Sequence, residues 1–209
     1  MDRGRLEAFS DGVFAVAITL LALNIAVSGR GLQHQLWLHR WSFGAYLLSF
    51  FVIGIIWVNH HMLIKSIALV DRTLLFLNLV LLLFVVLIPF STATVAQYLP
   101  VPGEGADVKV AMAMYSAVFL GMSAGFGLIF EWTLHGDHRT VPLPPEAHWP
   151  ARLRFVGGAT VYVVAFVVAL FNAIAAFILI AVTAVYYIVE RTPTSAAAPP
   201  GSPGDPEAV

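Results

Sequence analysis

The chain has 209 residues, of which 59% are hydrophobic and only 11% are charged, and its mean hydropathy is +0.85. This composition lies outside the range of water-soluble domains and indicates an integral membrane protein. The formal net charge of −1, without a basic run, gives no indication of nucleic-acid binding. A chain without cysteine forms no disulfide, thiolate nucleophile or cysteine-ligated metal site.

Six apolar segments predict an all-α bundle of six transmembrane helices. They cover approximately residues 6–27, 43–64, 73–99, 107–132, 154–171 and 173–190. The last two come from a run of 35 apolar or small residues between Phe155 and Val189, and a single helix of that length would measure about 52 Å. A hairpin that turns near Leu170 to Ala173, where Asn172 is the one strongly polar residue, fits a bilayer better; one long tilted helix is the alternative.

The first segment has one aliphatic face and a separate polar one. At 100° per residue, one face, here called the seam, carries Phe9, Val13, Val16, Leu20, Leu23 and Val27. The seam indicates either ordinary packing against a neighbouring helix or, if several copies meet on a symmetry axis, the wall of a pore. Asp11 lies about 140° from the centre of the seam. Because a carboxylate inside a membrane span is costly, we expect Asp11 to have a partner.

The second segment carries a polar cluster near the same side of the membrane, made of Trp57, Asn59, His60 and His61. Residues three or four apart share a helix face, so Trp57 and a histidine can point the same way. Indole and imidazole N–H groups are natural donors to a buried carboxylate. The alternative is that these side chains only mark the membrane interface.

Loop charges predict the orientation of the chain. With the N-terminus in the cytoplasm, the external loops hold three basic residues, Arg30, Arg40 and Lys109. The cytoplasmic segments then hold eight, which are Arg3, Arg5, Lys65, Arg72, Arg139, Arg152, Arg154 and Arg191. This bias favours six spans in the cell membrane with both termini cytoplasmic.

The remaining segments suggest connections and packing. Residues 135–150 contain three histidines at no strong metal-ligand spacing and are expected to be a cytoplasmic linker without a metal. Residues 192–209 are rich in proline, glycine and small polar residues, which predicts a disordered cytoplasmic tail after a single domain, residues 1–191. Gly121, Gly125 and Gly127 predict close helix packing.

No motif of an enzyme appears: there is no G-x-S-x-G, H-E-x-x-H, P-loop or dinucleotide fingerprint. We therefore expect no enzymatic activity and no cofactor. A small secondary transporter or a metal-handling membrane protein is the alternative to a channel, although the chain shows no internal repeat.

Two motifs carry a family resemblance. The stretch Arg5–Leu20, RLEAFSDGVFAVAITL, resembles the first-helix signature R-x-x-x-F-S-D of the transmembrane protein 175 family of potassium channels, bacterial branch. The run W-x-x-H-H from Trp57 to His61 is similar to the second-helix motif of that family. The resemblance covers residues 1–190.

The resemblance implies a leak-type cation channel that selects potassium over sodium, with potassium ions as the permeant species. It also implies a homotetramer in the lipid bilayer, with the first helix around a central pore. The carbonyl filter T-V-G-Y-G of other potassium channels is absent; the nearest string, Thr94–Tyr98, has no glycine. The family's aliphatic constriction maps onto Val16, Leu20 and Leu23, and its selectivity threonine onto Thr19.

The resemblance assigns the polar residues a structural role. The implied network that holds the pore helices comprises Arg5, Phe9, Ser10, Asp11, Trp57, His60 and His61. A narrow apolar ring makes an ion shed water, which favours the less strongly hydrated potassium ion. Thr19 hydroxyls would replace part of the lost water, unless each one is occupied by the carbonyl of Ala15, four residues earlier.

Overall fold

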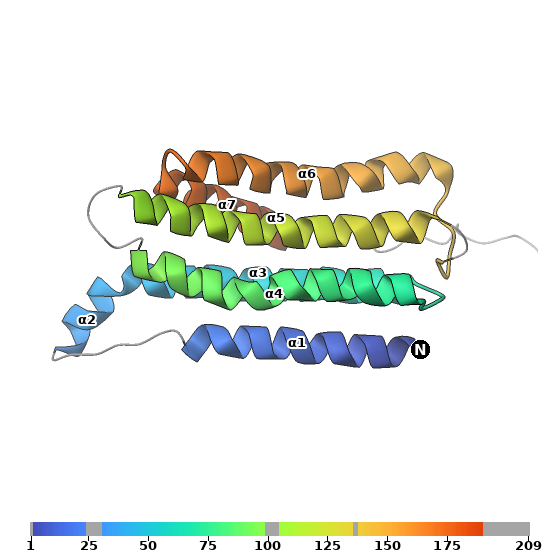
Figure 1. The fold of residues 1–209 in the computed structure, drawn as a ribbon, viewed down its shortest axis with the longest axis horizontal. Coiled ribbons are helices and arrows are strands. Elements are labelled where there is room, and N and C mark those ends of the chain that lie inside the picture. The colour runs from blue at the N-terminus through green and yellow to red at the C-terminus, as the bar shows by residue number, and fades with distance from the viewer. Residues whose placement is uncertain (1, 24–30, 99–104, 136–137, 190–209) are drawn as a thin grey trace, which may run out of the picture.

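The computed structural model describes residues 2–23, 31–98, 105–135 and 138–189 of the chain. These residues form helices and, apart from one isolated bridge between Ile67 and Arg139, no β-structure (Figure 1). The helices are α1 (Arg3–Leu23), α2 (Leu32–Leu38), α3 (Arg40–Lys65), α4 (Arg72–Tyr98), α5 (Ala106–Leu134), α6 (Pro145–Ala169) and α7 (Ala173–Val189).

The predicted all-α membrane bundle is confirmed, since each of the six apolar segments forms one helix. Five of the described helices can cross a membrane by length and composition: α1, α3 over residues 42–65, α4, α5 and α6. Helix α7 is a shorter apolar helix. The short helix α2 was not predicted, because seven residues of mixed polarity carry no helical period. Parts of the first, third and sixth predicted segments and the whole predicted tail lie outside the described residues.

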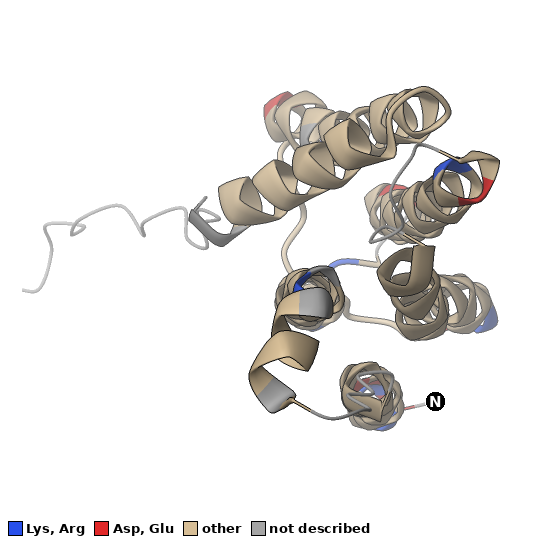
Figure 2. Ribbon diagram, turned by 90° about the vertical axis from the view of Figure 1, so that its left-hand side faces the viewer, with Lys and Arg blue, Asp and Glu red and all other residues tan. Residues whose placement is uncertain are grey.

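The bundle is centred on α4 and α5, and α1 lies at its edge. Viewed along the helices, α1 adjoins α3 and α4 and lies far from α6 and α7 (Figure 2). The side of α1 that faces α3 and α4 is fully buried, through Leu6, Ser10, Phe14, Ala17 and Leu21. Within the described residues, the chain therefore covers only one side of α1.

Close packing of α4 against α5 depends on two glycines. A Cβ on Gly125 would lie 3.0 Å from Cα of Leu81, and one on Gly121 would lie 2.2 Å from the ring of Phe84. A Cβ on Gly127 would meet nothing within 4 Å. The predicted role in helix packing is thus confirmed for Gly121 and Gly125, whereas Gly127 faces open space.

The C-terminal apolar run forms the expected hairpin and not one long helix. Helix α6 ends at Ala169, α7 begins at Ala173, and Oδ1 of Asn172 accepts a hydrogen bond from the N–H of Ala175 at 2.8 Å. The short polar side chain of Asn172 satisfies an N–H that the first turn of α7 leaves without a helical partner. This bond explains why the chain turns at its one polar residue.

Helix α6 begins earlier than predicted, at Pro145 and not near residue 154. The end of the expected linker 135–150 therefore belongs to α6, over about one and a half helical turns. Proline at the first helical position presets the backbone angle, and Glu146 in the first turn interacts favourably with the helix dipole. These capping preferences outweigh the low hydropathy of residues 145–153.

The N-terminus and two loops join at one end of the bundle. Nη1 of Arg3 donates hydrogen bonds to the carbonyls of Lys65 at 3.4 Å and Ile67 at 3.2 Å. The α3–α4 loop then pairs with the α5–α6 loop, through Ala68 N–H to His138 O at 2.7 Å and Thr140 N–H to Ser66 O at 2.9 Å. Burial at this junction lowers the pKa of the Arg139 guanidinium below its ordinary value.

Candidate functional site

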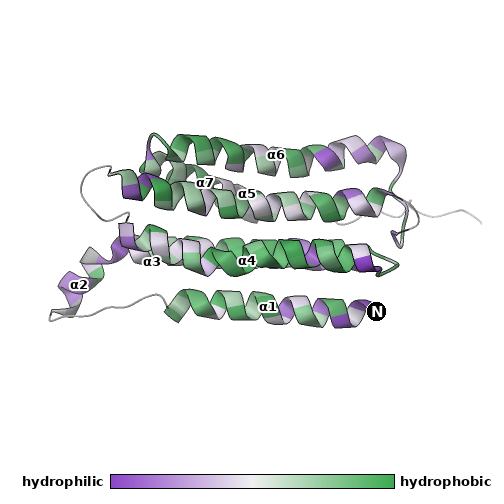
Figure 3. Cartoon of the chain, in the orientation of Figure 1, coloured by the Kyte–Doolittle hydropathy of each residue, from purple (hydrophilic) through white to green (hydrophobic). Residues whose placement is uncertain are grey.

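The seam of α1 is left uncovered by the chain. Val16 is 55% exposed, Leu20 37% and Leu23 79%, and Phe9 at the other end of the seam is 52% exposed. Val13 is partly buried and Val27 lies outside the described residues. Hydrophilic residues of α1 concentrate toward its N-terminus, so the exposed C-terminal half is aliphatic (Figure 3). Packing within one chain therefore does not account for the seam.

Thr19 lies beside the seam and is exposed. Its hydroxyl donates a hydrogen bond to the carbonyl of Val16 at 2.8 Å, one position away from the Ala15 carbonyl that the sequence suggested. A hydroxyl that donates in this way still carries lone pairs that can accept from water or contact a cation.

A chain of hydrogen bonds runs through the buried contact of α1, α3 and α4. Nε2 of His60 lies 2.7 Å from Oδ1 of Asn78, whose Nδ2 donates to Oγ of Ser10 at 3.0 Å. Oγ of Ser10 donates in turn to the carbonyl of Leu6 at 2.9 Å. Since an amide oxygen can only accept, the proton of this contact lies on Nε2 of His60. The three side chains therefore satisfy one another where the three helices meet.

A second polar contact lies closer to the surface, one residue further along α1. The indole N–H of Trp57 donates to Oδ1 of Asp11 at 2.8 Å. The ring of His61 stacks on Trp57, with the ring centroids 6.1 Å apart. His60 and His61 therefore belong to different contacts, because adjacent residues on a helix point about 100° apart.

Two members of the expected network do not join either contact. Phe9 belongs to the exposed seam. Arg5 is exposed, and within the described residues its side chain has no hydrogen bond or ion pair with the other polar groups. The reason is helical geometry: Arg5 lies about 140° around α1 from Ser10. Arg3, two residues earlier, is the arginine that binds the α3–α4 loop.

Asn78, which connects Ser10 to His60, is not part of the network that the resemblance implies. It is the one polar side chain in the stretch 74–90 of α4. A lone amide in such an apolar stretch signals an interhelical hydrogen bond, but its partners depend on how the helices are placed.

The histidines of the α5–α6 connection are bound separately. His138 stacks on Trp132 with a centroid distance of 3.9 Å, while His135 and His148 contact the carbonyls of Glu131 and Leu143. In the described part of the chain, no three histidine or acidic side chains form a group that could hold a metal ion.

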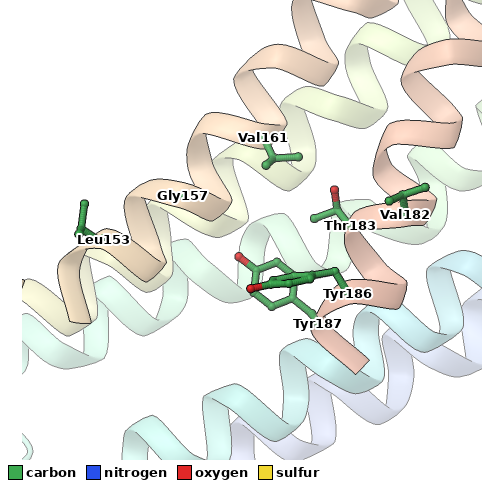
Figure 4. A pocket seen from close by; sticks show the side chains of 7 residues that line it. All are labelled: Leu153, Gly157, Val161, Val182, Thr183, Tyr186 and Tyr187. Carbon is green, nitrogen blue, oxygen red and sulfur yellow. The ribbon is translucent and has the colours of Figure 1, made fainter. Parts of the chain in front are cut away.

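A groove opens between α6 and α7, away from α1. Its volume is about 520 Å³, and its walls are mostly apolar. Figure 4 shows the side chains of Thr183, Tyr186 and Tyr187 on α7 beside it, with Leu153 and Val161 on α6. None of the residues singled out on α1 or α3 lines this groove.

Comparisons with known proteins agree with this architecture. A family model described as the endosomal/lysosomal potassium channel TMEM175 matches residues 5–89. The chain is 43% identical over 166 residues to a potassium channel of Streptomyces collinus, which covers 77% of this chain and 79% of that relative. It is 39% identical over 143 residues to a potassium channel of Chamaesiphon minutus, which covers 65% of this chain and 68% of that relative.

A solved structure extends the similarity to most of the fold. The crystal structure of a lysosomal potassium-selective channel TMEM175 homolog from Chamaesiphon minutus superimposes with a TM-score of 0.78 at 31% identity. The superposition covers 89% of this chain and 96% of that one. By its identity to these relatives over most of their length, the chain belongs to the TMEM175 family.

Proposed function

We propose that this protein is a potassium-selective leak channel in which four copies place α1 around a central pore. The observation that carries the proposal is the seam: large aliphatic side chains on α1 stay exposed while another side of the helix, about 100° around from them, is fully buried. The relatives named as potassium channels support the same function.

Selectivity would arise where Val16, Leu20 and Leu23 narrow the pore. An aliphatic ring gives an ion no ligands, so an ion that passes must lose part of its hydration shell. Potassium gives up water more readily than sodium, which makes dehydration the selective step. Thr19, between these rings, supplies hydroxyl oxygens that offset part of the loss. We expect no cofactor, and potassium ions are the permeant species.

The polar contacts would then serve the scaffold. Ser10, Asn78 and His60 fix the rotation of α1 against α3 and α4, and Trp57 holds Asp11 away from the seam. Residues 1–191 act as one transmembrane channel domain, with residues 192–209 as a tail.

For the location, we infer the cell membrane with both termini in the cytoplasm. The N-terminus and the α3–α4 and α5–α6 loops lie at one end of the bundle, and this end carries most of the basic residues. Basic residues concentrate on the cytoplasmic side of membrane proteins.

The transporter alternative predicts a polar cavity inside one protomer. Among the described residues, the buried polar side chains where α1, α3 and α4 meet are instead bonded to one another. That arrangement favours the channel, in which the path lies between copies.

Flux into liposomes tests the proposal. Purified protein should let potassium into vesicles faster than sodium, without a coupled ion or a pH gradient, and its mass in detergent should correspond to four chains. Uptake that saturates and requires a second ion gradient would contradict a channel and favour the transporter.

A further inference from the structure

The exposed surface of α1 holds a second face beside the seam, made only of small residues. This small-residue face consists of Ala8, Gly12, Ala15, Thr19 and Ala22, all of them exposed. Their spacing of four and three residues keeps them on one side of the helix. A Cβ on Gly12 would meet nothing within 4 Å, so its own chain leaves the space above it open.

Asp11 and Trp57, the hydrogen-bonded pair next to the small-residue face, indicate that lipid alone does not cover this side of α1. Asp11 is partly exposed and Trp57 is 41% exposed, although both lie within helices long and apolar enough to cross a membrane. An acidic side chain that faces hydrocarbon is costly, and such groups normally face protein or water. Protein that packed on the small-residue face would cover the edge of this pair as well.

Helix α4 carries the opposite kind of surface. Its outward side presents a row of large apolar side chains, here called the outer α4 row. The row consists of Phe76, Val80, Leu83 and Phe90, between 41% and 61% exposed, with Leu79 and Val86 beside them. Small residues let a neighbouring helix approach closely, and large side chains fill the space that they leave.

The two surfaces lie at the same depth. Helices α1 and α4 run in the same direction (Figure 1), and the bond between Ser10 and Asn78 fixes their alignment at an offset of 68 residues. Both helices rise about 1.5 Å per residue, so this offset holds along their length. It places the two members of four residue pairs at the same depth along the helices: Ala8 with Phe76, Gly12 with Val80, Ala15 with Leu83, and Ala22 with Phe90.

Within one chain these pairs point apart. On α1, the small-residue face is directed away from the buried side that holds Ser10 and contacts α4. On α4, the outer α4 row lies opposite the buried positions that include Asn78 and Val85. In a ring of copies about an axis normal to the membrane, however, every copy lies at the same depth in the membrane. Two residues at the same depth in one chain are therefore also at the same depth in two adjacent chains.

We propose that the small-residue face of α1 is the docking surface for the outer α4 row of the adjacent copy. This contact joins two different surfaces, and repetition of such a contact closes a ring when the rotation between copies allows it. The inference rests on the proposed assembly around α1 and adds which surfaces join its subunits. It also places Thr19 at the boundary between the pore and the subunit contact.

Cysteine cross-linking tests the pairing, because the natural chain has no cysteine. The double variant Ala15→Cys with Leu83→Cys should, on oxidation in proteoliposomes, give a ladder of covalent oligomers that ends at the ring size. A disulfide requires Cα atoms about 4.4–6.8 Å apart. The control Ala22→Cys with Phe76→Cys combines mismatched levels, about 21 Å apart along the helix, and should give no ladder.

The outcomes separate this inference from the proposed function. Absence of the ladder in protein that still forms tetramers and conducts potassium would overturn the pairing and leave the channel intact. A ladder of equal strength in the mismatched pair would also overturn it. Protein that is monomeric and conducts no potassium would overturn both.

A bulky substitution gives an independent measurement. Ala15→Phe adds a ring where the isolated chain has free surface, so the protomer should keep its helical circular dichroism. Its mass in detergent should fall from tetramer to monomer. Ala124→Phe, at an exposed alanine of α5, a helix that α3 and α4 separate from α1 (Figure 1), should remain tetrameric. An Ala15→Phe variant that assembles as well as the natural protein would contradict the docking surface.

Discussion

Nδ2 of Asn78 donates a hydrogen bond to Oγ of Ser10 across 3.0 Å, and both side chains are fully buried. This contact joins α4 to α1 and continues to His60 on α3. A helix otherwise held by apolar contacts can rotate or slide at low cost, whereas a buried amide must keep its partner. The bond therefore fixes which side of α1 the chain leaves exposed.

Ser10→Ala should destabilise the protomer by about 1–3 kcal/mol, since it leaves a buried amide N–H without an acceptor. Thermal unfolding in detergent measures the loss. Ser116→Ala is the matched control: Ser116 is equally buried and donates at 2.9 Å to Met112 of its own helix. Equal losses in both variants would mean that the bond from Asn78 contributes nothing.

Truncation of the seam should weaken selectivity. Leu20→Ala or Leu23→Ala widens an aliphatic ring, so sodium needs to shed less water and the sodium-to-potassium flux ratio in liposomes should rise severalfold. Leu128→Ala is the control, because Leu128 is an exposed leucine of α5 away from α1. Ratios unchanged in both α1 variants would show that the seam is only a packing surface.

Thr19→Val should shift the reversal potential under potassium/sodium bi-ionic conditions toward lower potassium preference. Valine keeps the shape of threonine but removes the oxygen that we propose replaces lost water. Thr160 on α6 makes the same kind of hydroxyl bond to its own helix, at 2.8 Å to Val156. Thr160→Val should therefore leave the potential unchanged. An unshifted potential in Thr19→Val would leave the aliphatic rings as the sole filter.

Loss of the carboxylate at Asp11 should impair assembly more than selectivity. Asp11→Ala leaves the indole N–H of Trp57 without its acceptor, which should lower the yield and melting temperature of the tetramer. The tetramers that do form should keep their flux ratio, because Asp11 lies away from the seam. A changed ratio at normal yield would instead place Asp11 in the ion path.

The glycines of α5 should differ in their tolerance of side chains. Gly125→Val should lower the free energy of unfolding by about 1–3 kcal/mol, because the new side chain overpacks against the backbone of Leu81. Gly127→Val, two residues away, has open space around its Cβ and should cost less than half as much. Similar melting temperatures for the two variants would show that the contact of α4 with α5 is not tight.

The sequence alone determined that the six apolar segments are helical and roughly where they end. A run of apolar residues in a bilayer must satisfy its backbone hydrogen bonds internally, and only the helix does so within one segment. The same reasoning located the hairpin turn at Asn172, and one helical period was enough to separate the seam from Asp11. It erred at α6, because the preference of Pro145 and Glu146 for the first turn of a helix acts over a few residues and leaves no hydropathy signal.

Which side chains bond to one another was decided only by the tertiary structure. Three contacts depend on the rotation and level of the helices relative to one another. They are the bond from Trp57 to Asp11, the bond between His60 and Asn78, and the binding of the α3–α4 loop by Arg3 and not by Arg5. Those two quantities are fixed by side chains that lie 46 to 68 residues apart in the chain. The periodicity of a single helix shows which residues share a face, but the face that remains exposed is decided by the helices that cover the others.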